Sequence, residues 1–341
     1  MPVKEQGMDA QMKRVLVTGG TGFIGSHLVK RLMDDNYSIR ILGRSSNRAQ
    51  IEKFKENGVE YIQGDIRDFD KLKYVFQNID VVFHLAGIVS DWDAPDKFRD
   101  INTKGTENVC KAALEANVKL LIYTSTNDVF GLREDKVITE EDEFEYWHEP
   151  YPDSKIEATR IVREYGKKGL PASIIYPCWV YGPGDTTFIT PLSEGIKSIF
   201  FCYWRKNALI WPLFIDNLID LLMLMATNPN AVGNEFIAHD GICISFEDFT
   251  AKLSHHLGIK VSRRYTSYIC AYSFAYTMES FWKLFNIKSR PLLTSYSVKN
   301  LGSRLRFSIK NAKDKLNWRP SCSYEKGMDI TMKWFKDHLE T

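Results

Sequence analysis

Short apolar runs alternate with longer amphipathic stretches through the first half of the chain. The runs are rich in Val, Ile, Leu and Tyr, whereas the stretches between them repeat apolar residues at helical spacing. This alternation predicts an α/β fold, a doubly wound parallel sheet with helices on both faces. The predicted strands cover residues 14–18, 37–42, 59–63, 81–85, 120–124 and 172–176, and the predicted helices cover residues 26–33, 47–57, 68–78, 100–116 and 155–167.

The composition is that of a globular protein. Apolar residues make up 44% of the chain, and 45 Lys and Arg against 43 Asp and Glu leave a formal charge of +2, which argues against nucleic acid as a partner. The six cysteines form no Cys-x-x-Cys pair, so neither disulfides nor a metal site is expected. Prolines break the longest uncharged run, 169–184, and the N-terminus lacks a signal-peptide core. We therefore predict no transmembrane segment and a cytoplasmic location.

A glycine-rich turn follows the first predicted strand. Gly19, Gly22 and Gly25 stand between that strand and the helix that follows it. In this context the first glycine permits a tight turn, the second lets the backbone approach a pyrophosphate, and the third allows close packing of helix on sheet. The turn therefore predicts a Rossmann dinucleotide site.

The end of the second predicted strand bears on which dinucleotide binds. An acidic residue there would hydrogen-bond the ribose 2′-hydroxyl of NAD, but the chain has Arg44 where a 2′-phosphate would lie. We therefore expect NADP(H) to be preferred over NAD(H).

Tyr151 and Lys155 open a predicted helix and, being four residues apart, share one of its faces. A phenol exchanges a proton near neutrality only if a cation lowers its pKa, which Lys155 beside a nicotinamide would do. The segment 123–131 ends a strand in hydroxyl residues that could reach a substrate oxygen. Together these residues predict acid–base chemistry.

The alternation stops after residue 184, where helical stretches at 216–227, 246–257 and 324–339 mix with short extended pieces. We expect a flexible tail at 1–11 and a dinucleotide-binding Rossmann domain at 12–185. Residues 186–341 are expected to form mainly a smaller, interleaved C-terminal α/β lobe for substrate, with 214–240 returning to the Rossmann domain.

From about residue 13 to residue 338 the chain resembles the extended short-chain dehydrogenase/reductase family, also called the NAD-dependent epimerase/dehydratase family. The resemblance rests on the glycine turn, the Tyr-x-x-x-Lys pair and a series of ordered matches. These are Gly-Asp-Ile-Arg-Asp (64–68), His-Leu-Ala-Gly (84–87), Asn-Thr-Lys-Gly-Thr (102–106), Tyr-Thr-Ser-Thr-Asn-Asp-Val-Phe-Gly (123–131), Pro-Cys-Trp-Val-Tyr-Gly-Pro-Gly-Asp (177–185), Phe-Ile-Asp-Asn (214–217) and Ala-Lys-Asp-Lys-Leu-Asn-Trp-Arg-Pro (312–320).

The resemblance implies a role for each matching residue. Thr126 would hydrogen-bond the reacting oxygen, Tyr151 would be the acid and base, and Lys155 would bind the nicotinamide ribose. Asp65 and Ile66 would contact the adenine, and Pro177 and Val180 would pack on the nicotinamide. With Arg44, the expected cofactor-binding residues are Gly19, Gly22, Phe23, Ile24, Gly25, Arg44, Asp65, Ile66, Leu85, Ala86, Gly87, Asn102, Tyr151, Lys155, Pro177 and Val180.

Two departures from the family pattern bear on the substrate. Dehydratases of nucleotide sugars carry Asp-Glu after the threonine, but here the pair is Asn127-Asp128, and asparagine cannot supply a proton. The apolar segment 209–213 stands where nucleotide-sugar enzymes place diphosphate-binding groups, although Arg205 and Lys206 lie close by. The chain is thus most similar to the 3β-hydroxysteroid dehydrogenase and dihydroflavonol reductase branch.

We therefore expect an NADP-dependent oxidoreductase that interconverts a ketone and a secondary alcohol on a hydrophobic substrate that resembles a steroid, a flavonoid or a β-keto acid. A nucleotide-sugar epimerase or 4,6-dehydratase is the first alternative, and a protein that binds NADP without catalysis is the second. His84 is interpreted as buried and hydrogen-bonded rather than catalytic.

The family resemblance and one aromatic stretch bear on how the protein assembles and what its surface contacts. Many proteins of the family pair two helices with their copies in a second subunit, so we expect a homodimer through the helices that begin at Asn102 and Tyr151. The aromatic stretch 265–285 is interpreted either as core or dimer contact, or as a substrate wall or peripheral membrane contact.

Overall fold

Seven parallel strands form the central sheet. The protein is described by a computed structural model that covers residues 13–45 and 47–339, so the predicted tail at 1–11 lies outside the described residues. The strand order is β3-β2-β1-β4-β5-β7-β11, and every neighbouring pair is parallel, which confirms the predicted doubly wound sheet. The strands are β1 (Arg14–Thr18), β2 (Ser38–Gly43), β3 (Glu60–Gln63), β4 (Val81–His84), β5 (Leu120–Thr124), β7 (Ala172–Pro177) and β11 (Glu235–Ala238).

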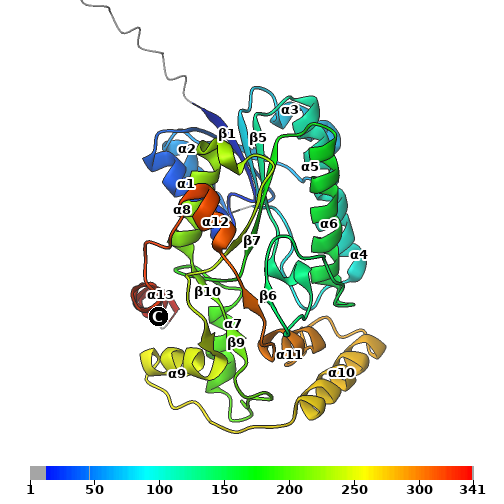
Figure 1. The fold of residues 1–341 in the computed structure, drawn as a ribbon, viewed down its shortest axis with the longest axis vertical. Helices are drawn as coiled ribbons and strands as arrows, with labels where there is room; N and C mark the ends of the chain where they lie inside the picture. Colours follow the sequence, from blue (N-terminus) through cyan, green and yellow to red (C-terminus); the bar gives the residue numbers. More distant parts are fainter. Residues whose placement is uncertain (1–12, 46, 340–341) are drawn as a thin grey trace, which may run out of the picture.

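Helices cover both faces of this sheet, which explains why its central strands are apolar along their whole length (Figure 1). Val15 and Val17 of β1 pack in the core on one face, and Leu16 between them packs in the core on the other. The first face is covered by α1 (Phe23–Asp34), α2 (Arg48–Glu56), α8 (Ile215–Thr227) and α12 (Lys310–Leu316). The second is covered by α3 (Phe69–Val75), α5 (Gly105–Glu115) and α6 (Pro150–Lys167).

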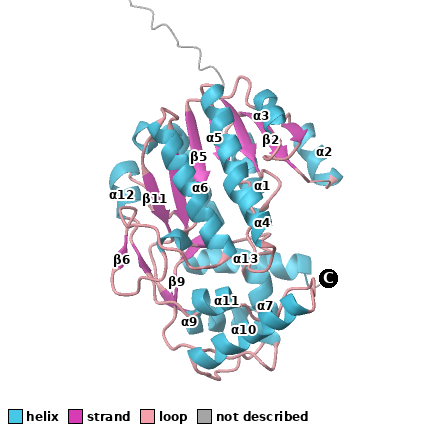
Figure 2. Cartoon of the chain, turned by 90° about the vertical axis from the view of Figure 1, so that its right-hand side faces the viewer, coloured by secondary structure: helices cyan, strands magenta, loops and turns pink. Residues whose placement is uncertain are grey.

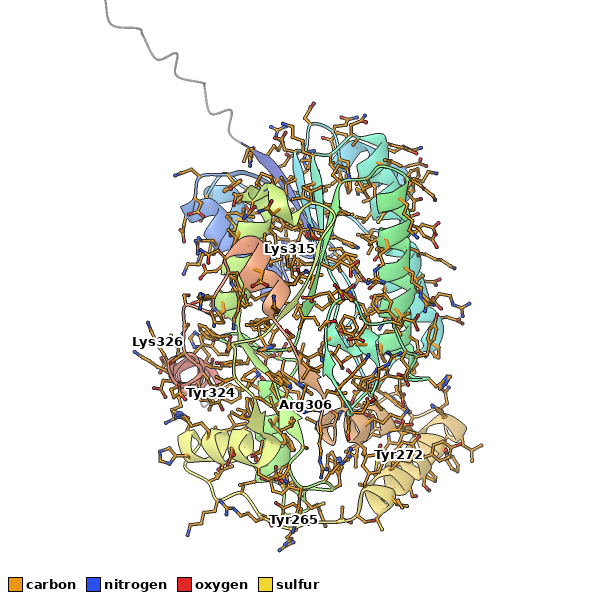
Figure 3. All side chains as sticks on the ribbon, in the orientation of Figure 1. Tyr265, Tyr272, Arg306, Lys315, Tyr324 and Lys326 are labelled. Carbon is orange, nitrogen blue, oxygen red and sulfur yellow. The ribbon has the colours of Figure 1, made fainter. Side chains whose placement is uncertain are left out.

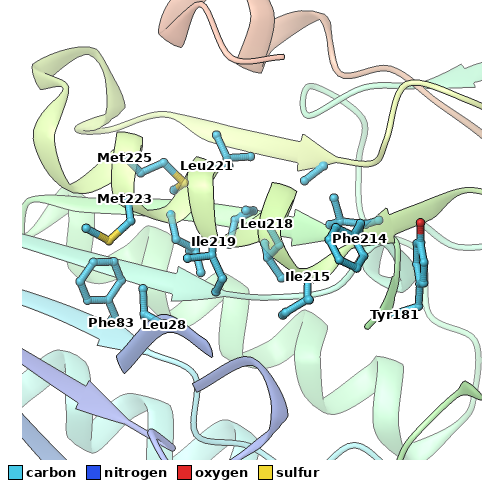
Figure 4. Close-up of a cluster of buried hydrophobic side chains, with 14 of the residues drawn as sticks. Leu28, Phe83, Tyr181, Phe214, Ile215, Leu218, Ile219, Leu221, Met223 and Met225 are labelled. Carbon is cyan, nitrogen blue, oxygen red and sulfur yellow. The ribbon is translucent and has the colours of Figure 1, made fainter. Parts of the chain in front are cut away.

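The core on the first face extends without a break into the smaller lobe. Figure 4 shows Leu28 of α1 and Phe83 of β4 at one end of this cluster, and Phe214 and Tyr181 at the other. Apolar residues of α8, such as Leu218, lie between the two ends. The sheet and the lobe are therefore held together by one continuous apolar core.

The smaller lobe lies beyond the carboxyl ends of the strands (Figures 1 and 2). Its helices are α7 (Ile189–Lys197), α9 (Phe246–His256), α10 (Tyr268–Leu284) and α11 (Ser295–Leu301), with α13 (Tyr324–Leu339) beside it. Short strand pairs connect it: β8 (Trp179–Tyr181) with β10 (Pro212–Phe214), β9 (Leu209–Ile210) with β12 (Ile244–Ser245), and β6 (Val137–Ile138) with β13 (Arg306–Phe307). The remaining elements are the short helical turns α4 (Pro95–Phe98), η1 (Arg99–Lys104), η2 (Asn127–Phe130) and η3 (Pro229–Ala231).

The structure bears on two sequence interpretations of the lobe. In the apolar segment 209–213, Ile210 and Leu213 are fully buried in the continuous core, whereas Leu209 and Trp211 are partly exposed. The stretch 265–285 is mostly the helix α10, and most of its large apolar side chains are exposed, so its interpretation as core is wrong. In the part of the chain that the structure describes, no helix is both long enough and apolar enough to cross a membrane.

The close packing of α13 on the continuous core yields a test of the fold. A Cβ at Gly327 would lie 2.6 Å from the Tyr181 hydroxyl and 2.9 Å from the Phe214 ring, both in the core. We expect Gly327→Ala to lower the free energy of unfolding by about 1–3 kcal/mol, because overpacking outweighs the helix propensity of alanine.

Urea denaturation measures this change, and Gly166→Ala in α6 is the matched control. No atom lies within 4 Å of a Cβ placed at Gly166, so this substitution should be neutral or should stabilise by up to about 1 kcal/mol. Equal effects of the two substitutions would contradict the packing described for α13.

Candidate active site

The glycine turn joins β1 to α1 at the carboxyl edge of the sheet. Gly19 has a φ of +74°, and a Cβ there would lie 2.9 Å from the backbone nitrogen of Ala86. A Cβ at Gly25 would lie 2.2 Å from the Gly19 carbonyl oxygen, so both positions require glycine. Gly22 is the N-cap of α1 and has no side chain to cap it, which leaves first-turn N–H groups at Phe23 and Ile24 to face an anion.

The loop after β4 lies against this turn and is held by Asn102. The Asn102 carboxamide accepts a hydrogen bond from the Ile88 backbone N–H at 2.8 Å and donates to the Ile88 carbonyl at 3.1 Å. It also donates to the Ser154 hydroxyl of α6 at 3.0 Å. Asn102 lies in the π-helical turn η1, and it fixes the loop 85–88 and α6 relative to each other.

Arg44 and Asp65 follow β2 and β3, the strands beyond β1. The Arg44 guanidinium is 57% exposed and lies 3.9 Å from the Asp65 carboxylate, whereas Arg67 binds that carboxylate at 2.8 Å. Arg67, and to a lesser extent Arg44, hold the pKa of Asp65 below its usual value. Arg44 is therefore not fixed by a tight ion pair. Ile66 is buried and packs on Gly105, the first residue of α5.

These residues fit a nicotinamide dinucleotide. The turn has glycine at three of its four positions from 19 to 22, it stands at the N-terminus of α1, and it lies between β1 and β4, where the strand order reverses. Pro177 ends β7 and Val180 lies in β8, at the same carboxyl edge of the sheet. The predicted cofactor-binding residues are thus distributed along this edge from β3 to β7.

Thr126, Tyr151 and Lys155 are brought together by the packing of α6 on the end of β5. The Ser125 and Thr159 hydroxyls are 2.7 Å apart, and Thr159 also donates to the Lys155 carbonyl at 2.6 Å. Thr126 caps η2, and all three predicted catalytic side chains are buried. Tyr151 stands in the first turn of α6 and Lys155 one turn later.

Lys155 is a buried amine with a single described hydrogen bond. Its Nζ donates to the Thr124 carbonyl at 2.7 Å and lies 4.5 Å from the centre of the Tyr123 ring. Burial lowers the pKa of Lys155 to about 7. The side chain is therefore able to exchange a proton near neutral pH.

Tyr151 has a phenol that holds its proton firmly in the protein alone. Burial raises its pKa, the Asp128 carboxyl raises it further, and a hydrogen bond with Thr126 opposes this rise. Its ring contacts Phe98 and Tyr296, with centroids 6.4 and 6.1 Å away. The Lys155 amine bonds to the Thr124 carbonyl, so a lowering of the Tyr151 pKa remains a prediction for the enzyme with its cofactor bound.

Asp128, which is buried, and Tyr296, which is half-buried, form a hydrogen-bonded pair beside Tyr151. The Tyr296 hydroxyl donates to an Asp128 carboxylate oxygen at 2.7 Å and accepts from the Asn300 amide at 3.0 Å. Burial raises the pKa of Asp128 to about 6, despite the hydrogen bonds from Tyr296 and Thr126 that lower it. Tyr296 belongs to α11 of the smaller lobe, and no motif in the sequence identified it.

Other residues considered for chemistry have structural partners. His84 is fully buried between the Thr18 and Thr106 hydroxyls, at 2.7 and 3.0 Å, and burial lowers its pKa to about 3, so its interpretation as a structural residue is confirmed. Arg205 forms a two-pronged ion pair with Glu134 at 2.7 and 2.6 Å. Neither residue is available for a new ligand without breaking these contacts.

The family to which the chain belongs follows from a match that covers most of the sheet and of the candidate active site. A model of the NAD dependent epimerase/dehydratase family matches residues 15–237. The chain belongs to this family. It is therefore an enzyme of a nicotinamide-dependent type that acts on CH–OH groups, and the predicted resemblance is confirmed.

Three curated relatives match nearly the whole chain. A 4-hydroxy-2-methyl-3-oxo-4-farnesyl-3,4-dihydroquinoline-1-oxide ketoreductase of Stigmatella aurantiaca is 26% identical, over 93% of this chain and 95% of its own. A 3 beta-hydroxysteroid dehydrogenase/Delta 5→4-isomerase of Mycobacterium tuberculosis is 26% identical, over 98% and 93%. A UDP-glucose 4-epimerase of Vibrio cholerae is 29% identical, over 95% of each chain.

The buried carboxyl of Asp128 makes stability depend on pH. Its pKa rises from 3.8 to about 6 on folding, so between these values the folded protein keeps a proton that the unfolded chain has released. The stability that this proton contributes is lost as the pH rises through about 6. We expect Asp128→Asn to be more stable than wild type at pH 8, on the order of 1–3 kcal/mol.

Urea denaturation at pH 8 and at pH 5 measures this difference. The asparagine oxygen still accepts from Tyr296, so the contrast isolates the charge. The advantage of the variant should shrink at the lower pH. If the difference in stability stays constant with pH, or if the variant is less stable at pH 8, then burial of the charged Asp128 carboxylate does not destabilise the protein.

Proposed function

We propose that the enzyme interconverts a ketone and a secondary alcohol on a hydrophobic substrate, with NADP(H) as the preferred cofactor. The observation that carries this proposal is the buried cluster of Thr126, Tyr151 and Lys155 at the carboxyl edge of the sheet, on the side of the glycine turn. Two hydroxyl groups and an amine that titrates near neutrality supply what proton transfer to a carbonyl oxygen requires.

The protein's own groups have distinct parts in the reaction. A bound nicotinamide supplies or accepts the hydride. Thr126 and Tyr151 hydrogen-bond the reacting oxygen, and Tyr151 passes its proton to that oxygen during reduction. Lys155, whose pKa is lowered to about 7, accepts or returns a proton and stabilises the phenolate when it is protonated. The apolar surroundings of these groups exclude water and strengthen each of these interactions.

Several observations support a hydrophobic ketone over a nucleotide sugar. Both oxidoreductase relatives are named for substrates with a large apolar part, a farnesyl group in one and a steroid in the other. Arg205, one of the two cations just before the segment where a diphosphate would bind, is already paired with Glu134. The other, Lys206, has its amine 5.5 Å from the centre of the Tyr265 ring. Asn127 cannot protonate a leaving hydroxyl as the acid of a dehydratase does.

A nucleotide-sugar epimerase is the second candidate, because the relative from Vibrio cholerae has the highest identity of the three. Two assays separate the candidates: NADPH oxidation with a panel of ketosteroids, β-keto esters and flavanonols, and product analysis after incubation with nucleotide sugars, because epimerisation causes no net oxidation of the cofactor. We expect turnover with a hydrophobic ketone and none with a nucleotide sugar. Conversion of a UDP-sugar to its epimer, with no ketone reduced, would replace this proposal by the second candidate.

The role of Tyr151 is tested on whichever ketone is turned over. Tyr151→Phe keeps the ring that contacts Phe98 and Tyr296, so cofactor binding should be unchanged. It removes the proton donor, so kcat should fall about 10²–10⁴-fold. Tyr146→Phe is the matched control: Tyr146 is 40% exposed and its hydroxyl accepts only from Arg160 among its described contacts. Near-normal turnover by Tyr151→Phe would show that Tyr151 is not the proton donor, and Asp128 would then be the next candidate.

The preference for NADP(H) is proposed from Arg44. A charge-assisted contact with the 2′-phosphate is worth about 1.5–3 kcal/mol, or roughly ten- to hundredfold in affinity. Fluorescence titration of wild type, Arg44→Ala and Arg319→Ala with NADPH and NADH measures this. Only Arg44→Ala should lose the preference, since Arg319 is an exposed arginine that lies after α12, far from β2 in the chain. Equal affinity of wild type for both cofactors would refute the proposal.

A further inference from the structure

Large apolar side chains are exposed together at the end of the smaller lobe. We call this the tip surface, and define it as Ile199, Phe200, Ile269, Phe274, Phe281, Leu284 and Phe285. Each of these side chains is between 49% and 78% exposed. Scattered exposed apolar residues need no explanation, but a group of this kind marks a surface that binds something.

The segment after α7 lies beside the segment that leads into α10. Ile199 and Phe200 follow α7, and the Ile199 carbonyl accepts a hydrogen bond from Arg264 at 3.2 Å. Tyr203 bridges to Tyr265, so the segment that leads into α10 runs along the segment that follows α7. Figure 3 shows Tyr265 and Tyr272 at the end of the molecule that is farthest from the sheet.

Two hydroxyl groups on the outward side of α10 bond within the helix itself. Its inward edge is formed by Ala271, Ala275 and Glu279, one turn apart. On the outward side, Thr277 and Ser280 donate their hydroxyl protons to helix carbonyls four residues back, both at 2.8 Å. These hydroxyl groups are therefore satisfied within the helix, as is required of polar groups that leave water.

In the sequence around α10 the charges are almost all positive, although one of them, Arg290, is paired with Asp91 in the loop after β4. Between residues 258 and 292 the chain has six Lys and Arg and a single acidic residue, Glu279. Glu279 is buried and accepts hydrogen bonds from Ser295, so it does not offset the charge at the surface. Exposed basic residues thus flank the apolar face at both ends, Arg263 and Arg264 before it and Lys283 and Lys288 at its end.

We propose that the tip surface docks on an anionic lipid bilayer, with α10 lying in the plane of the interface. An aromatic-rich apolar face flanked by Lys and Arg matches the apolar interior and the anionic headgroups of such a membrane. A second copy of the chain fits less well, because α10 carries positive charge at both ends. Two copies packed along α10 would bring like charges together whether they ran parallel or antiparallel.

The inward edge of α10, opposite the face that docks, is linked to the candidate active site through α11. Glu279 of α10 accepts from the Ser295 backbone N–H at 2.7 Å, and Ser295 begins α11, which carries Tyr296. Docking would leave α5 and α6 clear of the membrane, because they lie on the sheet at the other end of the molecule (Figure 1). The inference goes beyond the proposed reaction, and vesicle binding can be measured without turnover.

Co-sedimentation of the full chain with phosphatidylcholine vesicles, with and without phosphatidylserine, tests this proposal. We expect binding to the anionic vesicles that weakens as salt is raised. Phe274→Ser combined with Phe281→Ser should weaken it at least about tenfold by removing apolar contact. Arg263→Gln combined with Lys288→Gln should weaken it to a similar extent, about tenfold, by removing charge.

Tyr74→Ser is the matched control, because Tyr74 is 56% exposed on α3, at the sheet end of the molecule, and its loss should leave binding unchanged. Circular dichroism checks that each variant is folded. Absence of vesicle binding by wild type, or binding that the serine variant retains, would overturn the proposal. Sedimentation equilibrium showing a dimer that only the serine variant loses, without vesicle binding, would assign the tip surface to self-association instead.

Discussion

The attachment of α6 to the end of β5 is the interaction on which the candidate site depends. Buried hydroxyls of Ser125 and Thr159 join the two elements, and Lys155 closes the contact through the Thr124 carbonyl. Because these groups are buried, losing one partner would strand another without a hydrogen bond, which is costly inside a protein. The same burial shifts the pKa values of Tyr151, Lys155 and Asp128, so the geometry and the acid–base properties of the site have a single cause.

Much of the first half of the molecule could be predicted because its signals are local. The period of the apolar residues gave six strands of the sheet, and the glycine turn required only its own spacing. Tyr296 could not be found in this way, because its contact with Asp128 joins positions 168 residues apart in the chain. The segment 209–213 shows the limit of hydrophobicity as a signal, since a core and a wall for an apolar ligand have the same composition.

The helix α10 escaped prediction for a related reason. Periodicity identifies a helix when one side is apolar and the other polar, but α10 has large apolar residues on its outward side and alanines on its inward side. The large apolar residues of α10 therefore face outward, whereas those of an ordinary surface helix face the core. The chain around it is held to the sheet half through Arg290 and Thr294, which both bind Asp91 in the loop after β4.

The path of the chain also limits how such an enzyme can be divided or recombined. It leaves the sheet after β7, returns for α8 and β11, leaves again, and comes back once more as α12 before α13. No single cut separates the two halves, so a fragment that ends at any one loop lacks either a strand of the sheet or part of the common core. The lobe is not one continuous segment of the chain, so it cannot be replaced as a separate domain. New substrate preferences in such an architecture must therefore arise from changes to individual side chains and loops.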